Sequence, residues 1–121
     1  MCSVSTNQPG ERRQVCGVQV LREATGLNVR LTDERLAHIL DHREMEGTAP
    51  ALARTLQEPT HIVESTSDAS DRLYYRPYSH PHLGDKLLCV VVKVLLKDTF
   101  IITAYLTDMV KRGTILWSRS D

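Results

Sequence analysis

Two histidines, His38 and His42, stand four residues apart in a segment with helical periodicity. Side chains at this spacing lie on the same flank of a helix, so the two imidazoles would be close enough to share a ligand. Imidazole is well matched to proton transfer near neutral pH, which makes both residues candidates for a general acid or base. In the alternative interpretations they are exposed or helix-capping histidines, or they join His80 and His82 in a metal site.

The local patterns of metal and cofactor sites are missing from the sequence. No glutamate follows His38 in the arrangement of a zinc peptidase helix. The three cysteines, Cys2, Cys16 and Cys89, lack metal-ligand spacing, and the six glycines are scattered rather than gathered in a phosphate-binding loop. We therefore expect chemistry that uses no metal and no cofactor.

Basic and aromatic side chains are interleaved around Arg72 and Arg76. Arginine between aromatic residues suits phosphate binding together with base stacking, as recognition of single-stranded RNA requires. Arg76 is the candidate catalytic group because it lies deeper in the expected strand, and Arg72, Tyr75 and Lys86 are candidate substrate-binding residues. In the alternative interpretation this is an ordinary strand with one tyrosine buried, one exposed and Arg76 in solvent.

Two hydroxyl side chains, Thr103 and Tyr105, stand two residues apart in an apolar, β-branched run. Residues at this spacing project from the same side of a strand. A core strand seldom contains a threonine without a partner for its hydroxyl group. Thr103 and Tyr105 are therefore candidate phosphate ligands, with a hydrogen-bonded structural hydroxyl as the alternative for Thr103.

These candidates would be positioned by helices that precede a sheet. Helices are expected over residues 33–46 and 49–56, the first capped by Thr32 or Asp33. Strands are expected at residues 60–65, 72–78, 87–96 and 99–105, with shorter ones at 15–21, 29–31 and 114–117 and a helical turn at 107–113. Consecutive strands with short links favour an antiparallel meander. The sequence predicts an α+β fold with one or two N-terminal helices packed on a four- to five-stranded antiparallel sheet.

Length and composition fit one globular domain. A chain of 121 residues with 41% hydrophobic and 25% charged residues is not a mostly disordered protein. We expect a flexible leader over residues 1–14 and a single domain over residues 15–121. No apolar run approaches the roughly 18 residues that span a bilayer, and the first residues do not resemble a signal peptide. We therefore expect a cytoplasmic protein with no membrane partner.

The charges are unevenly distributed although the net charge is zero. Residues 32–71 hold nine acids and three bases, a net charge of −6, whereas residues 72–121 hold eight bases and four acids, a net charge of +4. A basic strand half would make one sheet face attractive to phosphate. Alternatively, these charges only solvate opposite faces.

Short segments spread over residues 28–117 resemble a known family. They are Leu-Thr-Asp-Glu-Arg-Leu-Ala-His-Ile-Leu-Asp-His at 31–42, Leu-Gln-Glu-Pro at 56–59, Leu-Tyr-Tyr-Arg at 73–76, Val-Val-Val at 90–92, Phe-Ile-Ile-Thr-Ala-Tyr at 100–105 and Leu-Trp at 116–117. This pattern resembles the phage-associated branch of the barnase–EndoU–colicin–RelE group of ribonuclease-like folds, whose helical segment precedes a four-stranded antiparallel sheet.

The resemblance implies a metal-independent endoribonuclease of the toxin type, with an antitoxin or immunity protein as its partner. His38 or His42 would take the proton from an RNA 2′-hydroxyl, Arg76 would stabilise the phosphoryl charge, and Thr103 and Tyr105 would position the phosphate. The product would be a 2′,3′-cyclic phosphate, and RNA would be the substrate.

One departure from the family pattern concerns the helix. Members often have His-Pro-Glu where this chain has His42-Arg43-Glu44, so we expect an uninterrupted helix and no special role for His42. The main alternative function is a non-catalytic RNA- or protein-binding module on the same scaffold. A metal-dependent hydrolase that uses the four histidines at 38, 42, 80 and 82 is a further alternative.

Overall fold

The computed structural model describes residues 17–111 and 113–118. In chain order its elements are β1 (Val18–Arg22), β2 (Asn28–Thr32), α1 (Asp33–Leu40), the 3₁₀ helix η1 (Arg43–Met45), α2 (Ala49–Gln57), β3 (His61–Ser65), β4 (Asp71–His80), β5 (Gly84–Val94), β6 (Thr99–Thr107) and β7 (Gly113–Ser118). The predicted flexible leader, residues 1–14, lies outside the described residues.

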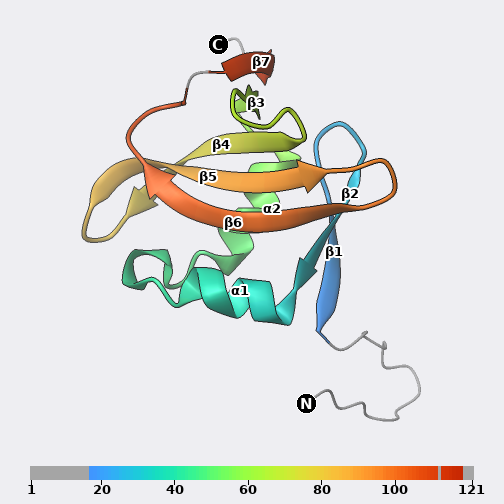
Figure 1. Cartoon of the computed structure of the whole chain (residues 1–121). Coiled ribbons are helices and arrows are strands. Elements are labelled where there is room, and N and C mark those ends of the chain that lie inside the picture. Colours follow the sequence, from blue (N-terminus) through green and yellow to red (C-terminus); the bar gives the residue numbers. More distant parts are fainter. Residues whose placement is uncertain (1–16, 112, 119–121) are drawn as a thin grey trace, which may run out of the picture.

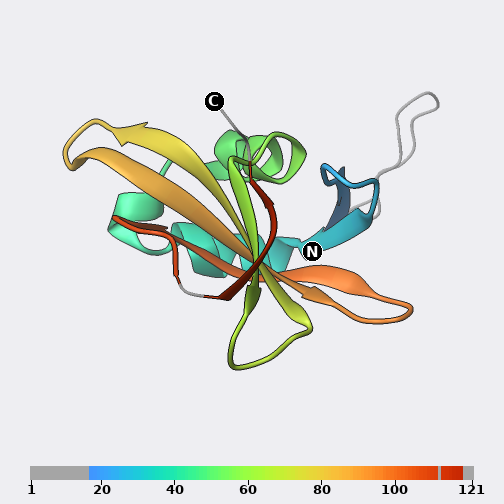
Figure 2. The ribbon, with the colours of Figure 1, turned by 90° about the horizontal axis from the view of Figure 1, so that it is seen from above.

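All seven strands belong to one sheet, and both α-helices lie on the same side of it (Figures 1 and 2). The strand order is β1-β2-β6-β5-β4-β3-β7. Helix α1 packs against β6 and β2, and α2 packs against β5, β4 and β1. We call the side under the helices the covered face and the opposite side the open face. No helix in the described part of the chain is long and apolar enough to cross a membrane.

The predicted four- to five-stranded antiparallel sheet is wrong, because the sheet is mixed and has seven strands. Strands β3 to β6 do form an antiparallel meander. The β1–β2 hairpin joins this meander at β6, where β2 runs parallel, and β7 joins it at the other edge, antiparallel to β3. Both additions pair segments that are distant in the sequence, and local residue patterns do not encode such pairings.

The helix predicted over residues 33–46 is also wrong, because it is interrupted after Leu40. His42 has an extended backbone (φ −77°, ψ 129°) and precedes η1. On an uninterrupted helix, Met45 would lie about 240° around the axis from the buried Ile39 and would miss the core. The break turns Met45 inward, and its side chain is fully buried. Burial of this apolar side chain accounts for the break without a proline.

Most of the hydrophobic core lies between the covered face and the helices. Its fully buried members include Leu52 and Leu56 of α2 together with Val90 and Val92 of β5. Burying side chains of this size contributes roughly 1.5–3 kcal/mol each. The covered face is therefore the side on which the fold gains most of its stability.

One buried carboxylate ties the β1–β2 turn to this core. Glu23 accepts hydrogen bonds from the backbone N–H groups of Thr25 and Leu27, from the Thr25 hydroxyl and from the Tyr74 phenol. Burial alone would raise the pKa of Glu23, but these hydrogen bonds outweigh it and hold the pKa below its ordinary value of 4.5. Burial and the Glu23 carboxylate in turn raise the pKa of Tyr74.

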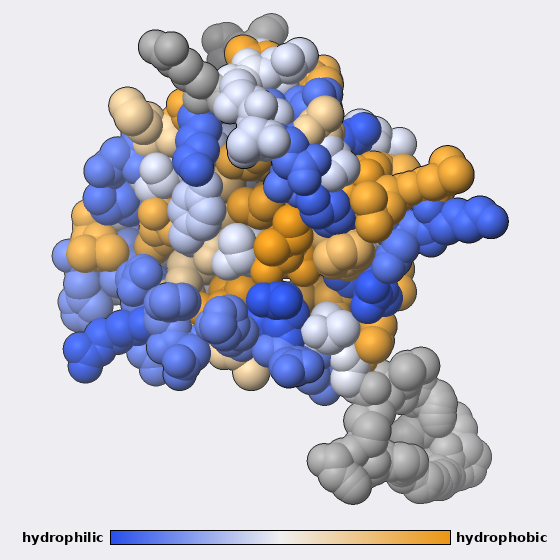
Figure 3. All heavy atoms as spheres, in the orientation of Figure 1, coloured by the Kyte–Doolittle hydropathy of each residue, from blue (hydrophilic) through white to orange (hydrophobic). Residues whose placement is uncertain are grey.

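The open face carries a smaller cluster that comes only from strands and from the connection between β6 and β7. Val63, Leu73, Tyr75 and Cys89 are buried in it, and the connection contributes Val110. In Figure 1 helix α2 lies behind the sheet, so the same view in Figure 3 looks onto the open face and shows apolar surface among hydrophilic residues. No helix of residues 17–111 and 113–118 covers this face, so its side chains are the more accessible ones among these residues.

Candidate functional site

The strand register brings four side chains into one row across the open face. His61 on β3 pairs with Tyr75 on β4, Tyr75 with Cys89 on β5, and Cys89 with Tyr105 on β6. Neighbouring strands lie about 4.8 Å apart, so the backbone of this row spans about 14 Å. Thr103 lies two residues before Tyr105 on the same face and flanks the row. We call these four paired residues the open-face row.

His61 is hydrogen-bonded to its neighbour Thr60. Thr60 Oγ1 donates to the backbone oxygen of Tyr75 at 3.1 Å and lies 3.1 Å from His61 Nδ1, and which of the two neighbours donates to the other depends on the tautomer of His61. In the tautomer that carries its proton on Nδ1, the lone pair lies on Nε2, where a general base would use it.

The connection between β6 and β7 brings a cation to the row. The backbone N–H of Lys111 donates to the Tyr75 phenol oxygen at 3.0 Å, and Lys111 Nζ lies 6.0 Å from the centre of the Tyr105 ring. The Lys111 side chain is exposed. Residues 108–111 form no helix, so the helical turn predicted there is wrong. The irregular backbone places the Lys111 ammonium over the Tyr105 ring and the Lys111 backbone N–H on the Tyr75 phenol.

The thiol and phenols of the open-face row stay protonated at neutral pH. Burial raises the pKa of Tyr75 to about 12 and the pKa of Cys89 to about 11. Burial, followed by the neighbouring Cys89, also raises the pKa of Tyr105. Tyr105 is half-buried, and its neutral phenol is a hydrogen-bond donor next to Cys89. Cys89 is fully buried as an unreactive thiol.

Three residues predicted from the sequence meet on this face, namely Thr103, Tyr105 and Tyr75. The prediction that Thr103 and Tyr105 share one side of a strand is confirmed. Tyr75 is fully buried, so its ring is not available for stacking on a base, and its phenol holds the Lys111 backbone instead. Thr103 and Tyr105 remain candidate ligands, whereas Tyr75 holds the backbone of Lys111 in place.

The histidine pair lies on the other side of the sheet. His38 belongs to α1 and His42 follows it, and α1 packs on the covered face. Both side chains are exposed, and their ring centres are 6.2 Å apart, as their spacing predicts. The structure therefore brings the two imidazoles together but does not bring them to Thr103 and Tyr105.

The predicted basic residues also lie on the covered side. Arg72 and Arg76 pair with Val92 and Leu88, which belong to the main core, so their side chains share its face. Arg76 donates from Nη1 to the backbone oxygen of Glu58 at 2.6 Å.

Lys86 is directly opposite Tyr78, which packs on the main core, and it forms an ion pair with Asp108 at 2.7 Å. These cations are thus separated by the sheet from the hydroxyl groups that they were predicted to assist.

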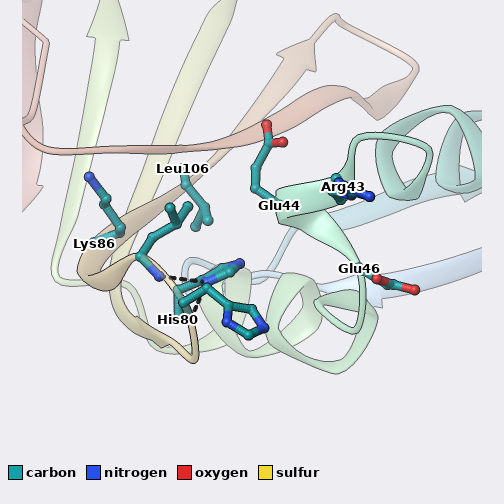
Figure 4. A pocket seen from close by; sticks show the side chains of 8 residues that line it. Arg43, Glu44, Glu46, His80, Lys86 and Leu106 are labelled. Atoms are coloured by element: carbon teal, nitrogen blue, oxygen red, sulfur yellow. Dashed lines mark hydrogen bonds between the residues drawn. The ribbon is translucent and has the colours of Figure 1, made fainter.

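A cavity of about 700 Å³ lies between η1 and the β4–β5 hairpin, with His80 and His82 in its lining (Figure 4). His80 Nδ1 accepts the backbone N–H groups of His82 and Leu83, both at 3.0 Å. Figure 4 shows Arg43 and Glu46 extending away from the histidines, so the charged groups of this cavity do not converge. Within residues 17–111 and 113–118, no group of three His, Cys, Asp or Glu side chains could hold a metal ion.

Comparisons of the chain with family models, with curated proteins and with solved structures find no match. The resemblance to the phage-associated ribonuclease group therefore stays a prediction.

Sequence reasoning did not single out His61 and Lys111. His61 is one polar residue at the start of an apolar strand, and only the β3–β4 register places it beside Tyr75. Lys111 lies in a segment whose pattern predicts a helical turn, and only the hydrogen bond to Tyr75 shows where it lies. The one local signal for His61 is its alternation with Ile62, which puts the two side chains on opposite faces.

Proposed function

We propose that the open face binds RNA and cleaves it without a metal ion. The observation that carries this proposal is the position of His61, which the strand register places on the same face as the Lys111 ammonium and the Thr103 and Tyr105 hydroxyls. An imidazole base, a cation and neutral hydroxyl donors are the groups that transesterification of RNA uses. The proposal keeps the chemistry predicted from the sequence and assigns it to a different histidine.

In the proposed reaction, His61 Nε2 takes the proton of an RNA 2′-hydroxyl. The 2′-oxygen attacks the adjacent phosphorus, the bond from phosphorus to the 5′-oxygen breaks, and the leaving oxygen takes a proton from solvent at the open face. The products are a 2′,3′-cyclic phosphate and a 5′-hydroxyl. The nucleophile belongs to the substrate, so the reaction needs no metal-bound water.

The remaining groups of the site would hold the RNA strand at a neighbouring phosphate, because the backbone of the row spans about 14 Å between His61 and Tyr105. The Lys111 ammonium offsets the charge of that phosphate, and the Thr103 and Tyr105 hydroxyls donate hydrogen bonds to its oxygens. The Tyr105 phenol suits this role because its raised pKa keeps it neutral. Tyr75 positions Lys111 through the backbone N–H of that residue.

The test is incubation of the purified chain with total RNA in EDTA, together with three histidine variants. We expect the wild type and His82→Ala to cleave RNA to cyclic-phosphate ends, and His61→Ala to lose about 100-fold or more of the rate. His38→Ala separates this proposal from the assignment made on sequence alone, because it should cleave like the wild type. Cleavage by His61→Ala at the wild-type rate would contradict the proposal.

RNA binding without cleavage is the second candidate function. It is favoured by one observation: His61 is the sole imidazole in the open-face row, whereas in-line displacement works best with an acid and a base on opposite sides of phosphorus. If a folded wild-type protein leaves RNA intact but binds it, and Lys111→Ala weakens that binding, the second candidate holds.

A further inference from the structure

A second cavity, separate from the open face, lies between α2 and β4. Its volume is about 430 Å³, and we call it the arginine groove because Arg54 of α2 and Arg76 of β4 both line it. Pro50, Pro77 and Tyr78 contribute apolar and aromatic wall. A cavity of this size is within the range of small-molecule sites. The sequence prediction for Arg76 had placed it with Thr103 and Tyr105, so the groove gives this residue a different setting.

One carboxylate stands between the two guanidinium groups. Glu58 Oε1 lies 3.4 Å from Arg54 Nε and 3.9 Å from Arg76 Nη2. Charge-assisted hydrogen bonds between these groups are normally about 2.7–2.9 Å, so neither contact is a close one. A single negative charge also leaves one of the two positive charges uncompensated. Among the residues that the structure describes, the pair of guanidinium groups is therefore incompletely neutralised.

The orientation of Arg76 does not depend on that carboxylate. Its Nη1 donates to the backbone oxygen of Glu58 at 2.6 Å, which is a carbonyl at the end of α2. The side chain of Arg76 is 22% exposed and that of Arg54 is 63% exposed. Arg76 is thus a fixed donor within the groove. Arg54 is a long, exposed side chain on α2 that can reach over a bound ligand.

We propose that the arginine groove binds a small phosphate monoester, whose phosphate contacts Arg54 and Arg76 and competes for their guanidinium groups with the Glu58 carboxylate, which lies outside the groove lining. A phosphate monoester dianion matches two guanidinium charges, and its three terminal oxygens can accept from both forks. The organic part of the ligand packs against Pro50, Pro77 and Tyr78. This site does not depend on the proposed RNA chemistry, because its lining shares no residue with the open-face row, Thr103 or Lys111.

The test is a titration of the full chain with phenyl phosphate, followed by backbone amide shifts in NMR spectra. We expect saturable shifts confined to residues that line the groove, a weaker response to inorganic phosphate, and none to phenol. No saturable shift with phenyl phosphate at millimolar concentration, or shifts spread over exposed basic residues elsewhere, would overturn the proposal.

Charge-neutralising variants decide which groups bind the phosphate. Arg54→Gln and Arg76→Gln should each weaken phenyl phosphate binding by about tenfold. Glu58→Gln should strengthen it severalfold, because the internal competitor is removed while its backbone oxygen still orients Arg76. Arg35→Gln, an exposed arginine on α1 outside the groove lining, should bind like the wild type.

Two results of the variant series would overturn the assignment. Weaker binding in Glu58→Gln would mean that the carboxylate helps to build the site rather than competing with the ligand. If Arg35→Gln and Arg54→Gln weaken phenyl phosphate binding equally, the affinity depends only on the net charge of the protein. Arg54 is largely exposed, so Arg54→Gln keeps the test decisive even if Arg76→Gln does not fold.

A short single-stranded RNA serves as a competitor. It should not displace phenyl phosphate, because the proposed RNA site is built from residues that do not line the groove. Displacement would show that the groove receives an RNA phosphate instead of a free monoester, and it would overturn the proposal. RNA cleavage or binding at the open face is read separately through His61→Ala and Lys111→Ala, so failure of either proposal leaves the other testable.

Discussion

The two faces of the sheet are built from the same strands, yet the neighbouring residues Tyr74 and Tyr75 show how differently they are used. Both phenol side chains are fully buried. The Tyr74 phenol points into the covered face and donates to the buried Glu23 carboxylate. The Tyr75 phenol lies in the open face and accepts from the backbone of an exposed connection. One tyrosine completes the core, and the other anchors a segment that ligands can reach.

Because successive side chains of a strand alternate between the two faces, the side chains that stabilise the fold lie mainly on the covered face and the accessible ones lie mainly on the open face. The covered face and the helices share a large cluster of fully buried aliphatic side chains, whereas the open face has a small cluster under partly exposed residues. Polar groups on the covered face are engaged by the fold, as Glu23 is by its hydrogen bonds. On the open face, His61 is partly exposed and the Lys111 side chain is exposed.

The largest expected effect comes from truncating neighbouring leucines on β5, one on each face. Leu88 is 1% exposed in the main core, and Leu87 is partly buried on the open face. Leu88→Ala should lower the free energy of unfolding by about 3 kcal/mol, because it removes apolar contacts and leaves a cavity. Leu87→Ala should cost about 1 kcal/mol. Urea denaturation measures both, and equal losses would contradict the division between the faces.

Replacing the buried carboxylate should have the next largest effect and should depend on pH. Glu23→Gln should cost about 2 kcal/mol at neutral pH, because charge-assisted hydrogen bonds in the core are weakened. The folded-state pKa of Glu23 lies below 4.5, so its contribution is present above pH 4.5 and is lost as the pH falls through the folded-state pKa.

Urea denaturation between pH 7 and pH 3 tests this linkage. The stability difference between the wild type and Glu23→Gln should shrink as the pH falls. A lowered pKa of Asp68, caused first by its bond with Lys93, adds acid sensitivity to both proteins and cancels in the difference. A difference that stays constant with pH would contradict the role given to Glu23.

Removing single phenol oxygens sharpens the comparison between the faces. Tyr74→Phe leaves a buried carboxylate oxygen without its partner and should cost about 1–2 kcal/mol in unfolding free energy. Tyr75→Phe should cost less than about 1 kcal/mol, because the Lys111 N–H can turn to water. If the proposed function is correct, only Tyr75→Phe should slow RNA cleavage or weaken RNA binding. A larger stability loss in Tyr75→Phe would reverse the assignment.

Local patterns in the sequence account for a definite part of this architecture. Helix α2 and strands β3 to β6 follow from the Pro-containing helical segment after Thr48 and from apolar runs separated by turns. The shared face of Thr103 and Tyr105 follows from the two-residue repeat of a strand. These features depend on neighbours in the chain, which is why one sequence is enough to predict them.

The remaining features depend on contacts between distant segments. No residue pattern near Asn28–Thr32 predicts the parallel pairing of β2 with β6. No pattern near Gly113–Ser118 predicts the pairing of β7 with β3. The break at His42 reflects the burial of Met45 among residues of other elements. His61 likewise becomes a site candidate only through its register with Tyr75 and its bond with Thr60. Tertiary register, rather than residue spacing, decides which polar side chains meet.

The smallest expected effect tests a cation that the sequence had assigned to substrate binding. Lys86 is paired with Asp108, whose side chain is 76% exposed, so the ion pair is held largely in solvent. Lys86→Ala should change the free energy of unfolding by less than about 1 kcal/mol, because exposed ion pairs gain little over hydration. It should also leave RNA cleavage and binding unchanged, whereas Lys111→Ala reduces both. If Lys86→Ala loses as much RNA cleavage or binding as Lys111→Ala, RNA contacts both faces across the edge of the sheet. The assignment of RNA to the open face alone would then be wrong.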